Sequence, residues 1–175
     1  MSIYQSLAKF GSKIIKKKTL FKYGFNFSPM YKRSTGKIME VSENLLKVKV
    51  KIPLSYKNKN YVGSIFGGSM FSAVDPIPMV QLINIIGEDY VVWDKSAEIF
   101  FKRPAKENLF ATFTYTEQEL EDIKQQLITE KEIEIVKTTE LTNKEGTQIF
   151  CLVKKKIYIA DKKYYKQKRK ARALK

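Results

Sequence analysis

One long apolar segment constrains the fold of this chain more than any other part of its sequence. Residues 62–87 contain a single charged residue, Asp75, and residues 68–86 are apolar nearly all round. Apolar side chains on every side are typical of a helix that is buried on every side. Pro76 and Pro78 each remove a backbone donor, so we expect the helix to kink or restart near Asp75.

The flanking segments alternate in the manner of β-strands. In residues 45–52, apolar side chains alternate with Lys47, Lys49 and Lys51, which gives one dry face and one wet face. Further strands are expected at residues 37–41, 90–101, 109–115, 130–141 and 147–159. A helix buried among alternating strands requires a sheet that wraps it. The predicted fold class is therefore α+β: an antiparallel sheet of about five to six strands around one long central helix, with a further helix at the N-terminus. Residues 118–127 fit either a short exposed helix or a bulged strand.

The net charge of +15 is concentrated at the two ends of the chain. Residues 1–37 hold nine Lys/Arg and no acid, and residues 154–175 hold eleven Lys/Arg and one acid. Residues 38–153 have thirteen bases and seventeen acids, so the middle is mildly acidic. This distribution argues against a nucleic-acid groove in the core, and we expect no nucleic-acid partner.

The charge distribution suggests one folded domain with two basic extensions. The expected units are a basic amphipathic helix (residues 1–30), the folded domain (31–160) and a basic tail (161–175), which frays or forms a charged helix. Apolar side chains at helical spacing (Ile3, Leu7, Phe10 and Ile14) mark one stripe on the first helix. That helix either docks on the domain or makes peripheral contact with a membrane. The basic ends favour a polyanionic partner, such as an anionic membrane leaflet, or they only aid solubility.

The sequence contains no histidine and a single cysteine, Cys151. Ser-His-Asp and Cys-His catalysis are excluded because both need imidazole as the base. The same shortage of ligands argues against a zinc site, and we expect no metal and no cofactor. A lone cysteine in an apolar strand fits core packing in a reducing compartment, so a cytoplasmic location is expected. A spanning helix needs roughly 18 to 20 apolar residues; we expect no apolar run that approaches this length and therefore no transmembrane segment.

Two segments resemble a known protein family. They are NYVGSIFGGSMFSAVDPI (residues 60–77) and DYVVWDKSAEIFFKRPAKENLFATF (residues 89–113). Together they resemble a bacterial hotdog-fold family classed as domain of unknown function 4442, within the acyl-CoA thioesterase superfamily. The resemblance extends over about residues 35–160. It implies a hotdog fold, a homodimer or dimer of dimers joined along sheet edges, and an acyl-thioester pocket at the dimer interface.

The resemblance also implies roles for individual residues. In hotdog thioesterases an HGG-type turn opens the central helix, and an Asp or Glu follows one to two turns later. Gly67 and Gly68 match the two glycines and Asp75 matches the carboxylate, whereas Phe66 stands where those enzymes often carry histidine. The implied activity is hydrolysis of an acyl-CoA or acyl-carrier-protein thioester. The missing histidine leaves open a non-catalytic protein that binds acyl or lipid thioesters.

The same residues can be interpreted from their chemistry alone. A helix N-terminus has unpaired N–H groups, so Gly67, Gly68 and Ser69 are candidates for polarising a thioester carbonyl; alternatively, the glycines only permit a tight turn. Asp75 is a candidate general base or nucleophile, or else the N-cap of a helix that begins at Pro76.

Other side chains are candidates for binding the substrate. The predicted substrate-binding residues are Asn58, Asn60, Ser64, Phe66, Ser69 and Asp94. Asp94 and Lys95 are neighbours in a strand and must point to opposite faces, so one of them faces inward or toward a partner subunit. The alternative for this pair is an ion pair with a neighbouring strand.

Overall fold

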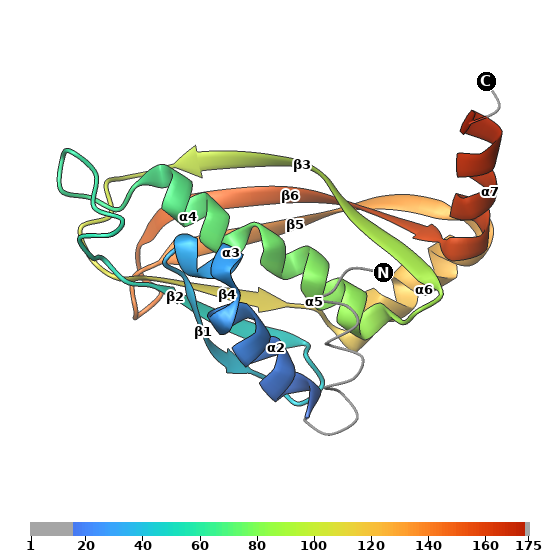
Figure 1. Cartoon of the computed structure of the whole chain (residues 1–175), viewed down its shortest axis with the longest axis horizontal. Coiled ribbons are helices and arrows are strands. Elements are labelled where there is room, and N and C mark those ends of the chain that lie inside the picture. The colour runs from blue at the N-terminus through green and yellow to red at the C-terminus, as the bar shows by residue number, and fades with distance from the viewer. Residues whose placement is uncertain (1–15, 174–175) are drawn as a thin grey trace.

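Six antiparallel strands form one sheet that curves around a central helix in the computed structural model, which describes residues 16–173 (Figure 1). The strands are β1 (Lys37–Val41), β2 (Lys47–Ile52), β3 (Tyr90–Phe101), β4 (Leu109–Thr114), β5 (Glu132–Thr142) and β6 (Ile149–Asp161). Their order across the sheet is β1-β2-β4-β5-β6-β3. The helices are α2 (Lys17–Phe27), α3 (Pro29–Arg33), α4 (Gly67–Val74), α5 (Pro76–Ile86), α6 (Glu117–Glu130) and α7 (Lys162–Ala173). The predicted α+β hotdog architecture is confirmed.

The central helix consists of α4 and α5, which are separated only by Asp75. Asp75 occupies the N-cap position of α5, which begins at Pro76 as that alternative predicts, but it has helical dihedral angles and its side chain makes no capping hydrogen bond. The predicted restart occurs where Pro76 and Pro78 withdraw their backbone donors. Two tyrosines bind carbonyl groups near this point, with Tyr31 donating to Ala73 at 2.9 Å and Tyr115 donating to Pro78 at 3.1 Å. Burial raises the pKa of both phenols.

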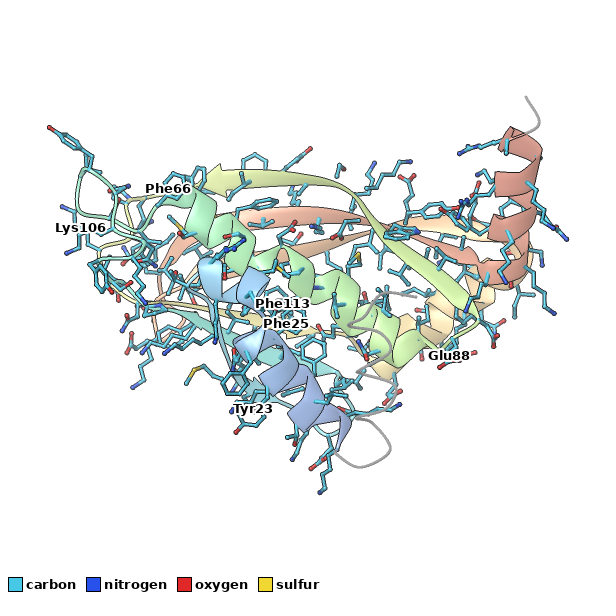
Figure 2. The ribbon with its side chains drawn as sticks, in the orientation of Figure 1. Tyr23, Phe25, Phe66, Glu88, Lys106 and Phe113 are labelled. Carbon is cyan, nitrogen blue, oxygen red and sulfur yellow. The ribbon has the colours of Figure 1, made fainter. Side chains whose placement is uncertain are left out.

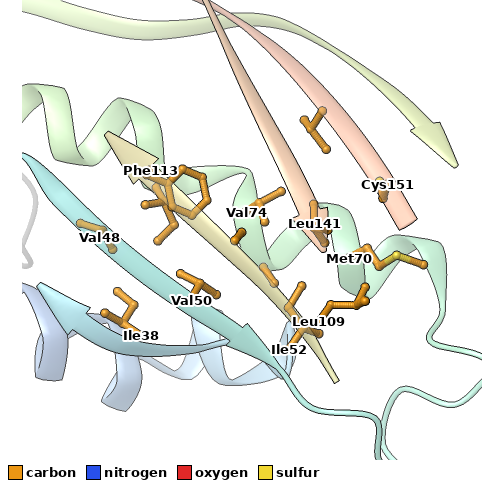
Figure 3. Close-up of a cluster of buried hydrophobic side chains, with 14 of the residues drawn as sticks. Ile38, Val48, Val50, Ile52, Met70, Val74, Leu109, Phe113, Leu141 and Cys151 are labelled. Carbon is orange, nitrogen blue, oxygen red and sulfur yellow. The ribbon is translucent and has the colours of Figure 1, made fainter. Parts of the chain in front are cut away.

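The inner face of the sheet packs on the central helix through alternating side chains. On β2, Val48, Val50 and Ile52 are buried while the intervening lysines point outward, as the period of two predicts. Figure 3 shows these side chains beside Val74 of α4 and Phe113 of β4. Burial of this apolar surface is the main force that holds the helix in the curve of the sheet.

Two expectations about the central helix are wrong, namely that no apolar segment is long enough to cross a membrane and that the helix is buried on every side. The continuous helix Gly67–Ile86 has 20 residues, so an apolar segment long enough to cross a membrane is present by length and composition. However, the sheet covers only one side of it, and 44% of its most apolar window is buried. Ser72 and Ile83 are exposed, and Asp75 and Met79 are half-buried on the same face. The helix packs into the sheet on one side and leaves a stripe of both polar and apolar side chains partly uncovered in the single chain.

The N-terminal helices cover the first edge of the sheet. The Asn26 amide accepts a hydrogen bond from the Ile38 N–H at 2.8 Å and donates one to the Ile38 carbonyl at 2.9 Å, so it pairs with β1 as a neighbouring strand would. Such pairing blunts an exposed strand edge. The apolar stripe predicted between Ile3 and Ile14 lies outside the described residues. The opposite edge is β3, which has no neighbouring strand on its outer side among the described residues.

The remaining elements settle two alternatives left open by the sequence. Residues 118–127 belong to α6, which begins at the N-cap Thr116, whose side chain accepts a hydrogen bond from the Glu119 N–H. The basic tail forms the helix α7, which has no buried residue and projects from the end of β6 (Figure 1).

Candidate functional site

A buried lysine joins two carboxylates on the inner face of the sheet. Lys155 of β6 has only 5% of its side chain exposed, and its ammonium group contacts Asp75 Oδ1 on the central helix. The same ammonium group lies 3.0 Å from Asp94 Oδ2 on β3. The side chains of Asp75 and Asp94 are 37% and 26% exposed. The cluster therefore unites the predicted catalytic carboxylate, the predicted substrate-binding Asp94 and a lysine that sequence reasoning missed.

The cluster lies between two separate parts of the hydrophobic core. One apolar cluster includes Val153 and the other includes Ile157, and Lys155 comes between these neighbours on β6. Lys137, its partner across β5 and β6, also lies in this band and forms an ion pair with Glu119 at 2.7 Å. Buried charges are costly unless they are paired, so a polar band inside an apolar core points to a role other than packing.

The two carboxylates of the cluster, Asp94 and Asp75, differ in their surroundings. Burial raises the pKa of Asp94, the charge of Asp75 raises it further, and Lys155 lowers it; burial prevails. Asp94 Oδ1 is buried and accepts no hydrogen bond among the described residues. By contrast, Asp75 Oδ1 is held by Lys155 while Asp75 Oδ2 makes no hydrogen bond within residues 16–173. The Oδ2 atom of Asp75 is thus available to a ligand or water.

The glycine turn lies at the start of the same helix. Gly67 and Gly68 donate no backbone hydrogen bond within the described part of the chain, whereas the Ser69 N–H is used by the Phe66 carbonyl at 3.0 Å. Two N–H groups rather than three therefore remain as candidate donors. A Cβ added at Gly67 would lie 2.7 Å from the ring of Phe101, and one at Gly68 would lie 2.3 Å from the ring of Phe66. Both positions thus favour glycine because aromatic rings pack against the turn.

The polar residues predicted before the glycine turn make hydrogen bonds within the protein. The Asn58 side chain is buried, donates to Thr35 Oγ1 at 2.7 Å and accepts from the Ser55 N–H at 2.9 Å. The Asn60 amide donates to Ser64 Oγ at 2.9 Å. These contacts show that the three residues shape the loop that leads into α4. Their role in substrate binding remains a prediction, as does that of Phe66, whose ring is largely exposed.

The alternative given for Asp94 and Lys95, an ion pair with a neighbouring strand, is observed for Asp94, and Lys95 is also paired. Asp94 faces inward to Lys155 on β6, and Lys95 faces outward to Glu134 on β5. Asp94 also borders an open groove of about 650 Å³ that lies between α7 and the sheet and includes Trp93. The groove shares Asp94 with the lysine cluster but does not include Asp75.

Neither a reactive thiol nor a metal-binding cluster is found among the described residues. Cys151 is buried, and burial raises the pKa of its thiol to about 11, so the thiol is protonated and unreactive at neutral pH. Within residues 16–173 no group of three or more Cys, Asp or Glu side chains is arranged to hold a metal ion.

Comparison with solved structures agrees with this architecture. The chain is similar to a probable thioesterase from Pseudomonas aeruginosa, with 16% identity, a TM-score of 0.68, and coverage of 82% of this chain and 93% of that one. It is also similar to a thioesterase from Haemophilus influenzae, with 11% identity, a TM-score of 0.58, and coverage of 81% and 88%. A thioesterase from Staphylococcus aureus gives 14% identity, a TM-score of 0.53, and coverage of 76% and 99%. At these identities the likeness shows the fold.

Comparison with curated proteins gave no match. A family model described as a domain of unknown function, DUF4442, matches residues 17–159, from the start of α2 to the end of the β6 core. The match spans most of the chain and includes the glycine turn, the central helix and the lysine cluster. The chain therefore belongs to the DUF4442 family, as the resemblance of its sequence indicated.

Proposed function

We propose that this protein hydrolyses an acyl thioester and that Asp75 is the catalytic carboxylate. The observation that carries the proposal is the contact between buried Lys155 and Asp75 at the middle of the central helix. The ammonium group holds one carboxylate oxygen and leaves Oδ2 free, which is the arrangement that an oriented base requires. The thioesterases of similar fold support a thioester as the substrate.

The proposed reaction uses Asp75 in one of two ways. As a general base, Oδ2 takes a proton from water, the resulting hydroxide attacks the thioester carbonyl, and the carbon–sulfur bond breaks to release a thiolate. As a nucleophile, the carboxylate itself attacks and forms an anhydride that water then opens. The N–H groups of Gly67 and Gly68 stabilise the developing oxyanion; a donor of this kind typically contributes about 3 kcal/mol.

The length of the helix supports a site that two chains share. Gly67 and Asp75 are eight residues apart, which corresponds to about 12 Å along a helix. One carbonyl group therefore cannot contact both the glycine turn and Asp75 of the same chain. A homodimer, or a dimer of dimers, brings the turn of one chain toward the carboxylate of another.

The uncovered surfaces of the single chain support the same dimer. The edge strand β3 carries the exposed rings of Phe100 and Phe101, and the central helix exposes the stripe that includes Ile83. A second copy that pairs along β3 would cover both surfaces. Sedimentation should show a dimer at micromolar concentration, and Ile83→Glu should weaken it. A monomer that retains full activity would contradict the shared pocket.

The proposed substrate is an acyl-CoA or an acyl-carrier-protein thioester in the cytoplasm. The exposed cations of α7, which include Lys163, Lys166 and Arg169, would attract the phosphates of CoA or an acidic carrier protein. A panel of acyl-CoA esters from short to long chains, assayed with the wild-type protein and Asp75→Asn, tests the proposal. We expect hydrolysis of part of the panel by the wild type and loss of that activity in the variant.

A second candidate is a protein that binds acyl thioesters without cleaving them. The ion pair with Lys155 favours it, because the ammonium group already occupies one oxygen of the Asp75 carboxylate. Phe66 in place of histidine favours it as well. In this case an acyl ligand co-purifies with the protein and no member of the panel is hydrolysed.

A further inference from the structure

The outer side of α2 and the adjoining residues expose large apolar side chains on the surface of the domain. Phe27 is 66% exposed, Met30 is 57% exposed, and Tyr23 and Met39 are each 49% exposed. Large apolar groups that gather on a surface mark a site of interaction. We name this surface the α2 face; it consists of Lys22, Tyr23, Phe27, Met30, Lys32 and Met39.

Contacts join most of these side chains into one surface. The rings of Tyr23 and Phe27 stack with their centroids 6.0 Å apart. Lys22 Nζ lies 5.8 Å from the centroid of Tyr23 and donates a hydrogen bond to the Met39 carbonyl at 2.7 Å. At the other end, Lys32 Nζ lies 5.5 Å from the centroid of Phe27. The two aromatic rings are therefore bracketed by two ammonium groups.

The segment that forms the α2 face carries only positive charges. Residues 16–39 carry seven Lys/Arg and no acid. The next acids along the chain, Glu40 and Glu43, are paired with Lys49 and Lys18. The complementary partner is therefore anionic.

The position and composition of the α2 face favour a membrane over a protein ligand as its partner. The helix α2 lies beside β1 at the edge of the domain (Figure 1). Figure 2 shows Tyr23 pointing away from the domain, whereas Phe25 lies on the side of the helix that faces the sheet. Recognition of a partner helix usually needs a groove to receive it. A helix face with exposed rings and flanking lysines instead fits the headgroup layer of a bilayer.

We propose that the α2 face docks on an anionic lipid membrane surface. The rings of Tyr23 and Phe27 enter the boundary between headgroups and acyl chains, and Lys22 and Lys32 contact the lipid phosphates. Asn26 and the buried Phe21 fix the helix to the domain, so the surface is formed before it meets the membrane. Membrane docking requires no thioester hydrolysis. The docking proposal can therefore fail while the proposed function holds, and the proposed function can fail while the docking proposal holds.

Flotation with vesicles tests this proposal on the full-length protein. The vesicles consist of phosphatidylcholine alone or of an equal mixture of phosphatidylcholine and phosphatidylglycerol. We expect binding to the mixed vesicles only, with weaker binding at high salt because exposed charges are screened. Tyr23→Ser/Phe27→Ser should weaken binding at least tenfold, and Lys22→Gln/Lys32→Gln should weaken it about fivefold for each lysine.

A matched variant elsewhere on the surface controls for lost aromatic rings. Tyr56 and Tyr61 are strongly exposed on the loop before α4, so Tyr56→Ser/Tyr61→Ser should bind vesicles as the wild type does. Thermal unfolding confirms that each variant is folded, and the lysine variant tests the surface even if the aromatic variant is unstable. Absent wild-type binding, equal binding by all variants, or binding only to an acidic carrier protein would overturn the proposal.

Discussion

Replacement of Lys155 by methionine tests whether the buried cluster is held together by its ammonium group. Methionine preserves most of the volume, so the main loss is the charge that faces Asp75 and Asp94. Removing one partner of a fully buried ion pair costs about 3–5 kcal/mol. The Asp75 side chain is 37% exposed, and water can partly solvate its charge once the lysine is gone. We therefore expect Lys155→Met to lower the free energy of unfolding by about 2–3 kcal/mol.

Unfolding in urea provides the assay, and the neighbouring lysine provides the control. Lys154 precedes Lys155 on β6 but points to the outer face and is exposed, so Lys154→Met should change the free energy of unfolding by less than about 0.5 kcal/mol. Adding Asp94→Asn to Lys155→Met should recover about 1 kcal/mol, because it removes a buried carboxylate that has lost its partner. If Lys155→Met costs no more than Lys154→Met, the inferred cluster is not a stabilising feature of the fold.

Three further predictions concern the residues around the cluster. Because burial raises the pKa of Asp94 above its unfolded value, its ionised form costs stability at high pH and the cost disappears as pH falls. Asp94→Asn should thus raise the melting temperature at pH 8, with a gain that shrinks toward roughly pH 4, and a constant gain would contradict this reasoning. Tyr31→Phe loses the hydrogen bond to Ala73 and should cost about 1 kcal/mol in urea unfolding; no change would mean that the bond is dispensable. Gly67→Ala should keep the unfolding free energy within about 1 kcal/mol, because the Phe101 ring can move, but should reduce thioester turnover; unchanged turnover would limit Gly67 to a structural role.

Local patterns in the sequence predicted most of the fold. The bounds of β1 and β3 agree with the alternating segments, and Asp75 separates α4 from α5 where two prolines predicted a restart. These features depend on residues that are close in the chain. The spacing of apolar side chains and the missing N–H groups of the two prolines are therefore sufficient to locate them. The exposure of Ile83 was not predicted because it depends on how far the sheet extends around the helix.

The candidate site was only partly predictable for the same reason. The isolated acid on an apolar helix identified Asp75, but its contact with Lys155 joins residues eighty positions apart. Lys155 belongs to a run of three lysines, which suggests a solvated surface. The alternation of Val153, Lys155 and Ile157 on β6 nevertheless places this lysine on the apolar face, and that signal could have found it.

The catalytic role of Asp75 is tested most directly by the turnover of the best acyl-CoA substrate at saturation. Asp75→Asn is nearly isosteric, and we predict that it keeps the melting temperature within a few degrees while turnover falls at least about a hundredfold. Asp89→Asn changes an exposed acid just before β3 and should retain wild-type turnover. Turnover in Asp75→Asn equal to that of the wild type would contradict the assignment of Asp75 as the catalytic carboxylate.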